Sequence, residues 1–392
     1  MSRPLTAELF PQWHADGVDE ILARCRELVE DPDFPTVKRW RERGGRVVGH
    51  FQVYFPEEIA HAAGLLPFKV RGAPLEPAQA DSHFGSYLCS ILKSSLELAL
   101  SKRVELDLFV THPICDAARN LAGVWGRNCG YPCRILYLPQ NPNSAFAVDY
   151  LRDEYQRLTR VVEEVAGAPV TAEALRGSIG VFNANRALLR RLYALRRAEP
   201  WRVSVDEAYV LVALAGMLPR EEHNALLSAV LPLLERRAVH RRDKVRVILE
   251  GGFCEQPPLD LLRAIGRSCD VVDDDLLVGL RWLVADVPVG DDPWRALAHA
   301  YVEGSAHSPV QHDLRKPKER MLVERLERCG AEAAILLAAK MCEPGLEELV
   351  VHTRTLDGRG VPYFVSEFEE NMTSFDGLEI QLETFVENLL FV

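Results

Sequence analysis

Cysteines are the residues of this chain best suited to metal or redox chemistry. The 392-residue sequence contains nine, and the closest two, Cys129 and Cys133, do not form a C-x-x-C pair. Most zinc ribbons and fingers need such close-set pairs, so the spacing argues against them. An odd number of cysteines in a large chain also does not indicate a disulfide framework. A metal site made of these thiols must therefore collect them from distant parts of the chain.

Three cysteines occupy positions at which an α/β fold presents ligands. Cys115 and Cys342 each lie just past a predicted strand, and ligands of open α/β sheets bind beyond the carboxyl ends of the strands. Cys89 opens a predicted helix over residues 90–100. The unpaired N–H groups of a helix N-terminus favour a thiolate. A [4Fe–4S] cluster normally has four cysteine ligands, so a three-cysteine set would leave one iron open to solvent or substrate.

A cysteine in a large chain is most often a small buried hydrophobic residue. We expect this role for Cys25, on the apolar face of a predicted helix, and for Cys329, just before a helix-ending glycine. It also fits Cys133 and Cys269, which begin predicted strands. Cys254 follows a strand and is a fourth candidate ligand, whereas Cys129, in a turn, is compatible with either role.

Short runs of β-branched and aromatic residues alternate with helical patterns, as is typical of βαβ units. The predicted strands cover residues 46–54, 67–70, 106–111 and 133–138 in the first half, and 245–250, 269–272, 331–337 and 362–365 in the last third. In both sets the third strand leads into a cysteine and a helix. The sequence therefore predicts an α/β fold with two similar small parallel-sheet domains of Rossmann or flavodoxin-like type. Domains that face each other would bring Cys115 and Cys342 into one cleft.

Helical patterns fill the rest of the chain. A helix is expected over residues 18–31, a capping box at Ser204 and Glu207, and a C-terminal helix from Asp376. The arginine-rich stretch over residues 186–197 is expected to be a solvated helix face. The predicted organisation is a helical N-terminal segment (1–45), a first α/β domain (46–150), a helical connecting region (151–240) and a second α/β domain (241–392).

Composition narrows the class of protein. The chain is 48% hydrophobic and 26% charged, enough to bury a sizeable core. Its net charge of −11 argues against a general nucleic-acid surface. The longest apolar run, residues 209–218, is shorter than the ~20 residues of a membrane span, and no apolar signal core follows the N-terminus. We expect a globular, cytoplasmic protein with neither nucleic acid nor membrane as a partner.

Several motifs resemble those of the benzoyl-CoA reductase/2-hydroxyacyl-CoA dehydratase family. The resemblance covers nearly the whole chain and is carried first by residues 51–67, 115–120 and 339–344. Other stretches are more similar to the smaller non-ATPase subunits, or C subunits, of ATP-dependent benzoyl-CoA reductases: 138–144, 251–258, 273–281, 308–312 and 367–375. The chain departs from many relatives at residues 277–281, where Leu-Val-Gly-Leu-Arg replaces Cys-Thr-Gly-Ser-Arg.

The resemblance implies that Cys89, Cys115 and Cys342 hold one [4Fe–4S] cluster between two α/β domains. It implies a subunit of an oxidoreductase that reduces the ring of benzoyl-CoA to cyclohexa-1,5-diene-1-carbonyl-CoA in anaerobic aromatic catabolism. The implied partners in a heterotetramer are a larger homologous iron–sulfur subunit and two ATPase subunits, with ferredoxin as the electron donor. Two alternatives are a subunit of a (R)-2-hydroxyacyl-CoA dehydratase and a non-catalytic redox-relay subunit. No lysine follows a glycine, so a Walker A motif is absent.

Other polar residues have two interpretations each. Glu57 and Glu58 could donate a proton or contact substrate, but carboxylates that cap a helix are the simpler interpretation. His112 could donate to a cluster sulfur or make a structural hydrogen bond. Residues 273–275, three aspartates, could bind a cation, although a solvated loop is favoured. The basic segments 241–244 and 315–320 could hold CoA phosphates, although exposed faces are favoured for them.

Overall fold

The protein contains two four-stranded parallel sheets. The computed structural model describes residues 9–10, 13, 17–51, 55–241, 243–251, 256–276 and 285–390. The first sheet has the order β2-β1-β3-β4 and the second the order β6-β5-β7-β8. The strands are β1 (Val47–His50), β2 (Leu66–Lys69), β3 (Leu108–Thr111), β4 (Cys133–Ile135), β5 (Val245–Gly251), β6 (Cys269–Asp274), β7 (Ala333–Ala339) and β8 (Tyr363–Phe368). The predicted α/β class, the repeat and all eight strand positions are confirmed.

Both sheets carry the same topological switch point. The strand order reverses between β1 and β3 in the first sheet and between β5 and β7 in the second. Ligands of doubly wound sheets bind at this place, beyond the carboxyl ends of the strands. Cys115 follows β3 and Cys342 follows β7, so the repeat places both thiols at equivalent positions.

Short and medium helices connect the strands. In the first domain they are α3 (Glu57–Ala62), η1 (Ala80–Ser82), α4 (Ser90–Leu100) and α5 (Asp116–Asn128). In the second they are α10 (Leu259–Ser268), α12 (Pro293–Val302), α13 (Lys318–Cys329), α14 (Glu343–Arg359) and α15 (Asp376–Leu390). Helix α13 ends as predicted at Gly330, whose left-handed φ of 58° suits glycine. The C-terminal helix begins at Asp376, also as predicted.

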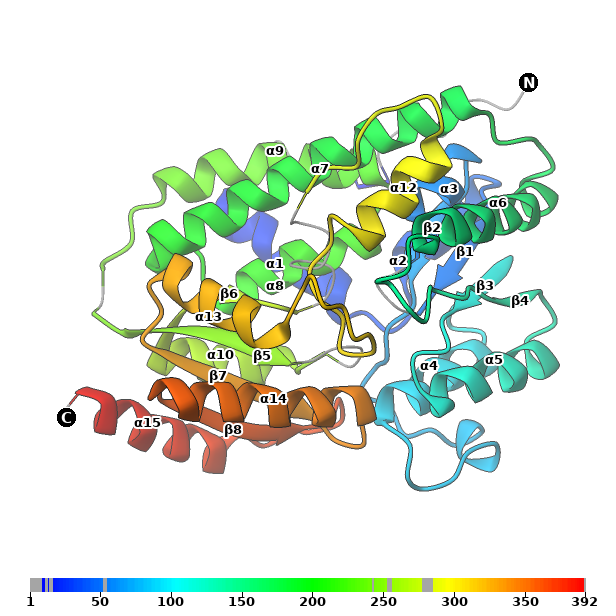
Figure 1. Ribbon diagram of the computed structural model, residues 1–392. Helices are drawn as coiled ribbons and strands as arrows, with labels where there is room; N and C mark the ends of the chain where they lie inside the picture. The colour runs from blue at the N-terminus through cyan, green and yellow to red at the C-terminus, as the bar shows by residue number, and fades with distance from the viewer. Residues whose placement is uncertain are drawn as a thin grey trace.

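The segment of the chain that links the first sheet to the second is helical (Figure 1). It consists of α6 (Ala147–Ala166), α7 (Ala172–Ala198), η2 (Pro200–Arg202), α8 (Val205–Ala213), η3 (Leu214–Gly216) and α9 (Arg220–Arg236). Helices α7 and α9 pack along each other, and the N-terminal helix α1 (Val18–Glu30), which precedes α2 (Pro35–Glu42), packs on α8. One hydrophobic core runs through both sheets and these helices. The domain boundaries named above stay a prediction.

Two arginines of the arginine-rich stretch are buried, so the expectation of a solvated face over residues 186–197 is wrong there. Arg186 forms an ion pair with Glu58, and Arg196 forms one with Asp274. Arg196 also donates to the carbonyl oxygen of Val271 at 3.1 Å. Buried charges need such partners, and these partners lie far away in sequence, Glu58 in α3 and Asp274 in β6.

No helix among the described residues has both the length and the apolar character to cross a membrane.

The predicted capping box is confirmed and supports a stability test. Ser204 Oγ accepts from the backbone N–H of Glu207 at 3.4 Å, and Glu207 Oε2 accepts from the backbone N–H of Ser204 at 2.9 Å. Ser204→Ala should lower the free energy of unfolding by about 1 kcal/mol, because α8 loses its N-cap. Urea denaturation measures the change. Ser204→Asp keeps a capping oxygen and is the control, and an equal loss in both variants would contradict the capping role.

Candidate functional site

All three predicted ligands occupy the same structural position, the N-cap of a helix. Cys89 precedes α4, Cys115 precedes α5 and Cys342 precedes α14. The backbone is extended at each cysteine and becomes helical at the next residue. The N–H groups of a first helical turn stabilise a negatively charged sulfur, and the Cys115 side chain is the one of the three that accepts a cap hydrogen bond from them.

Cys115 shows this stabilisation directly. Its Sγ accepts a hydrogen bond from the backbone N–H of Ala118 at 3.4 Å. Burial raises the pKa of the Cys115 thiol, the N–H groups of Ala118 and Ala117 lower it, and the carboxylates of Glu343 and Asp116 raise it. Without a cation beside it, the thiol is therefore protonated at neutral pH. An iron ion would supply the positive charge that makes the thiolate favourable.

The structure brings the neighbourhoods of Cys115 and Cys342 together. Glu343, the residue after Cys342, is near enough to Cys115 to influence its pKa. Ile114, Glu343 and Pro344 line one open cavity of about 590 Å³. The loop before α5 and the start of α14 therefore border the same cavity, and the convergence of the two thiols in one cleft stays a prediction.

The helix that begins after Cys89 contacts the second domain. Helix α4 packs against α5. On α4, Ser94 Oγ donates to Glu370 Oε2 at 2.8 Å, and Glu370 belongs to the segment that follows β8. All three helices that begin at a candidate cysteine therefore contact or approach the other domain.

The local chemistry of these residues fits an iron–sulfur cluster. Cysteine thiolates are the usual ligands of such clusters, and hydrogen bonds to sulfur tune their potentials. The residue before Cys342, Met341, has a left-handed φ of 59°. This conformation is uncommon for a non-glycine residue, and such strain concentrates at functional sites. Cys342 Sγ lies above the first turn of α14, 3.5 Å from where a Cβ on Gly345 would lie.

The remaining described cysteines have structural positions. Cys25, Cys269 and Cys329 are buried, as expected of small hydrophobic residues, whereas Cys133, which begins β4, is only partly buried. Burial raises the pKa of Cys25, Cys133 and Cys269 to about 12 and that of Cys329 to about 11. Cys129 is the C-cap of α5, the end that disfavours a thiolate, and burial raises its pKa to about 11. Cys254 lies outside the described residues.

Glu57 and Glu58, in the first turn of α3, form ion pairs with arginines of other helices. Arg220 of α9 pairs with Glu57, Arg186 of α7 pairs with Glu58, and His50 Nε2 lies 3.1 Å from Glu57 Oε1. Burial disfavours the charged form of Glu57, but Arg220 and His50 overcome this and hold its pKa below the usual range. An ionised, arginine-bound carboxylate is a poor proton donor, so the helix N-terminal interpretation is supported.

His112 makes the structural hydrogen bond that was one of its two interpretations. Its Nδ1 lies 3.1 Å from the carbonyl oxygen of Leu136 and must carry the proton, since a carbonyl only accepts. Burial lowers the pKa of His112 to about 3. The ring is therefore neutral with an unprotonated Nε2, which cannot donate to a sulfur.

The three consecutive aspartates are buried, so the solvated-loop interpretation is wrong. Asp273, Asp274 and Asp275 are at most 4% exposed. Their carboxylates are bound by protein groups rather than left for a cation. Asp274 pairs with Arg196, Asp273 lies 3.4 Å from Arg328 Nη2, and Asp275 accepts from the N–H of Gly251 at 2.9 Å.

The basic segment over residues 315–320 is largely committed to protein contacts. Arg315 Nη2 donates to Pro142 at 2.7 Å, Lys316 Nζ to Val302 at 3.0 Å and Lys318 Nζ to Pro309 at 3.0 Å, each to a carbonyl oxygen. In the other segment, Lys244 Nζ donates to the carbonyl oxygen of Gly266. These contacts hold loops in place and leave fewer donors for CoA phosphates.

A group of buried titratable residues near the cavity was not foreseen. His307 precedes the cavity-lining segment 309–319, while Glu348 and His352 lie on α14. The spacing of Glu348 and His352 places them on one face of a helix, which the sequence could have revealed. His307 lies 41 residues before Glu348 and could not be joined to them from sequence.

Fold and site define a class of α/β proteins with two parallel sheets that place cysteines at the N-termini of helices. The chain belongs to the 2-hydroxyglutaryl-CoA dehydratase, D-component, family, whose model matches residues 52–389. It is 35% identical to the C subunit of benzoyl-CoA reductase of Thauera aromatica over 378 residues, which cover 94% of this chain and 98% of that protein. The resemblance inferred from the motifs is thus confirmed.

Dehydratase subunits of the family are also similar to this chain. Lactoyl-CoA dehydratase subunit beta of Anaerotignum propionicum is 26% identical over 376 residues, 95% of this chain and 99% of that protein. (R)-2-hydroxyglutaryl-CoA dehydratase subunit beta of Acidaminococcus fermentans is 22% identical over 360 residues, 90% of this chain and 94% of that protein. The relatives are therefore subunits of reductase and dehydratase enzymes.

Proposed function

We propose that the chain is the smaller iron–sulfur subunit of an ATP-dependent benzoyl-CoA reductase. The observation that carries the proposal is the 35% identity to the C subunit of benzoyl-CoA reductase over 94% of the chain, against 26% or less for the dehydratase subunits named above. The reaction adds two electrons and two protons to the ring of benzoyl-CoA and gives cyclohexa-1,5-diene-1-carbonyl-CoA. Reduced ferredoxin supplies the electrons.

Cys89, Cys115 and Cys342 would hold one [4Fe–4S] cluster, which supplies electrons at low potential when bound. The chain itself provides the thiolates and, at Cys115, an N–H donor from Ala118 that lowers the charge density on sulfur. The apolar residues Ile114 and Pro344 form part of the border of the adjoining open cavity, next to Cys115 and near Cys342 in the sequence. Limited solvent exposure is one of the factors that set the potential of a cluster.

Other chains must supply the energy and complete the enzyme. The sequence has no Walker A motif, so we assign ATP hydrolysis to two companion subunits. A larger homologous iron–sulfur subunit is the proposed partner across the cavity. The heterotetramer would work in the cytoplasm during anaerobic degradation of aromatic compounds.

The second candidate is a subunit of a (R)-2-hydroxyacyl-CoA dehydratase. It is favoured by the family description and by the 26% identity to lactoyl-CoA dehydratase subunit beta over 95% of the chain. A dehydratase recycles its electron, so it needs ATP only for activation. A third candidate is a non-catalytic scaffold or redox-relay subunit, whose cluster never meets substrate. Full activity after replacement of a cysteine ligand would favour the scaffold role.

The amount of ATP consumed per turnover separates the first two candidates. The complex, purified without oxygen, is given reduced ferredoxin, ATP and either benzoyl-CoA or a (R)-2-hydroxyacyl-CoA. We expect the cyclic diene as product, with ATP hydrolysed in proportion to each ring reduced. Dehydration of the hydroxyacyl-CoA with only catalytic ATP would instead assign the chain to the dehydratases.

A further inference from the structure

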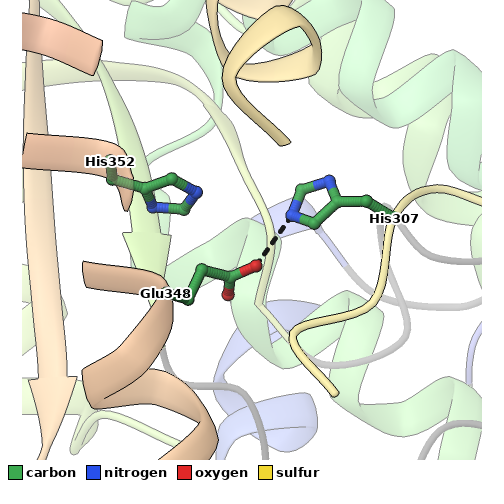
Figure 2. A group of neighbouring side chains, drawn as sticks. All are labelled: His307, Glu348 and His352. Carbon is green, nitrogen blue, oxygen red and sulfur yellow. Dashed lines mark hydrogen bonds and ion pairs between the residues drawn. The ribbon is translucent and has the colours of Figure 1, made fainter. Parts of the chain in front are cut away.

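His307, Glu348 and His352 form a compact group of buried side chains beside the interdomain cavity. Figure 2 shows the three side chains pointing toward one another, with His307 on the loop before α13 and the other two on α14. One ligand atom from each residue lies within 4.8 Å of the other two. His307 Nε2 and Glu348 Oε1 are 2.9 Å apart.

His352 has a buried ring nitrogen for which the described part of the protein offers no hydrogen-bond partner. Its side chain is buried, with 3% of the residue exposed, and its Nε2 has no hydrogen-bond partner among the described residues. Leaving a buried polar atom unsatisfied costs free energy. Burial lowers the pKa of His352 to about 4, so the ring is neutral at pH 7. A neutral imidazole is the form that binds metal ions.

The electrostatic surroundings favour an added cation. Glu250 is buried near Glu348, and its ion-pair partner is Arg325, which also faces Asp273. Burial, with the charges of Asp275, Glu348 and Asp273, raises the pKa of Glu250 well above its usual range although Arg325 opposes this. Around Glu250 and Glu348, negative charge therefore outweighs the charge that Arg325 supplies.

We propose that His307, Glu348 and His352 bind one divalent transition-metal ion of the zinc type. Two imidazoles and one carboxylate are an established ligand set for Zn²⁺. Bond lengths of about 2.0–2.2 Å place ligands of one ion about 3–3.5 Å apart. The 2.9 Å separation of His307 and Glu348 is already close to this range, and the ligand atom of His352 lies within 4.8 Å of both.

The ion would act as a structural clamp between the loop and α14. Lys318 Nζ, 3.8 Å from Glu348 Oε1, also donates to the carbonyl oxygen of Pro309, a bond it can retain when metal binds. Because α14 begins at Cys342, the clamp fixes the helix that carries a proposed cluster ligand. The ligands are nitrogen and oxygen atoms, so the site is chemically distinct from the cysteine set.

Metal binding tests this inference without reference to activity. The full-length chain, purified without oxygen and treated with a mild chelator, is titrated with Zn²⁺ by calorimetry and with Co²⁺ by visible absorption. We expect one site per chain with a visible Co²⁺ band, and at least 100-fold weaker binding in His352→Ala. His240→Ala, at an exposed position, is the control and should bind as the wild type does.

Two further variants keep the test decisive. Cys115→Ser should retain the Zn²⁺ site, which separates it from the iron–sulfur ligands and from the proposed function. If His352→Ala does not fold by circular dichroism, His307→Ala replaces it. Absence of a Zn²⁺ site in the wild-type chain, or unchanged affinity in the histidine variant that folds, would overturn the proposal.

Discussion

Cys115→Ser should lose most of its cluster iron and lower benzoyl-CoA reduction by more than about 100-fold. Removal of a proposed first ligand should cost at least as much as the 10–100-fold typical of residues that only support ligands. The substitution tests the ligand role rather than the fold. Serine is a preferred N-cap residue, and its oxygen can accept from Ala118 N–H as the sulfur does. Helix α5 should therefore remain intact.

The measurement is iron and acid-labile sulfide content with low-temperature EPR, followed by ring reduction in the assembled complex. Cys129→Ser is a matched control, because Cys129 caps the other end of α5. It should keep its iron and its activity. Full iron content in Cys115→Ser would refute the proposed ligand set. Loss of iron with full activity would show that this cluster carries no electrons to the substrate, and it would favour a non-catalytic scaffold role for the subunit.

The sequence predicted the strands well because parallel strands are buried on both faces and read as apolar runs. Val245–Gly251 and Ala333–Ala339 are such runs, and the segment after Ala339 ends in Cys342. The repeat then placed Cys115 and Cys342 at equivalent switch points without any distance information. These inferences needed only local pattern and topology.

The sequence did not predict which charged residues are buried. Arg196 has the same local pattern as a solvated helical arginine, and its burial depends on Asp274, 78 residues away. In the sequence, Asp273 likewise has the pattern of an exposed loop residue. Its burial depends on ion pairs with Arg325 and Arg328, which lie far away along the chain. The periodicity of apolar residues in a sequence indicates only the average environment of a helix face. It carries no signal for one buried ion pair formed across domains.

Arg220→Met should destabilise the protein by about 3–5 kcal/mol at pH 7. Removal of one partner of a buried ion pair leaves the other charge uncompensated, and here that charge is the carboxylate of Glu57, which is 7% exposed. Arg220 Nη1 also donates to Asn185 Oδ1 at 2.8 Å, a bond that methionine cannot make. Urea denaturation, with its midpoint and slope, measures the loss.

Two matched variants separate the charge effect from the loss of side-chain packing. Arg236→Met lies at the exposed end of the same helix, α9, and should change stability by no more than about 0.5 kcal/mol. The double variant Glu57→Gln/Arg220→Met removes the stranded charge and should recover part of the loss. A double variant no more stable than Arg220→Met would show that the buried carboxylate is not the cause.

The dependence of stability on pH tests the same prediction independently. In the wild type the pKa of Glu57 is held below its usual value of 4.5, so its stabilisation is present above that pH and is lost as the pH falls through the folded-state pKa. In Arg220→Met the main charge that lowers this pKa is gone, and burial favours the protonated acid. The variant therefore gains stability, relative to the wild type, as the pH falls toward 4.5 and below. The difference in stability should narrow from pH 7 to pH 4, and a difference that stays constant over this range would mean that Arg220 acts through packing rather than through the charge of Glu57.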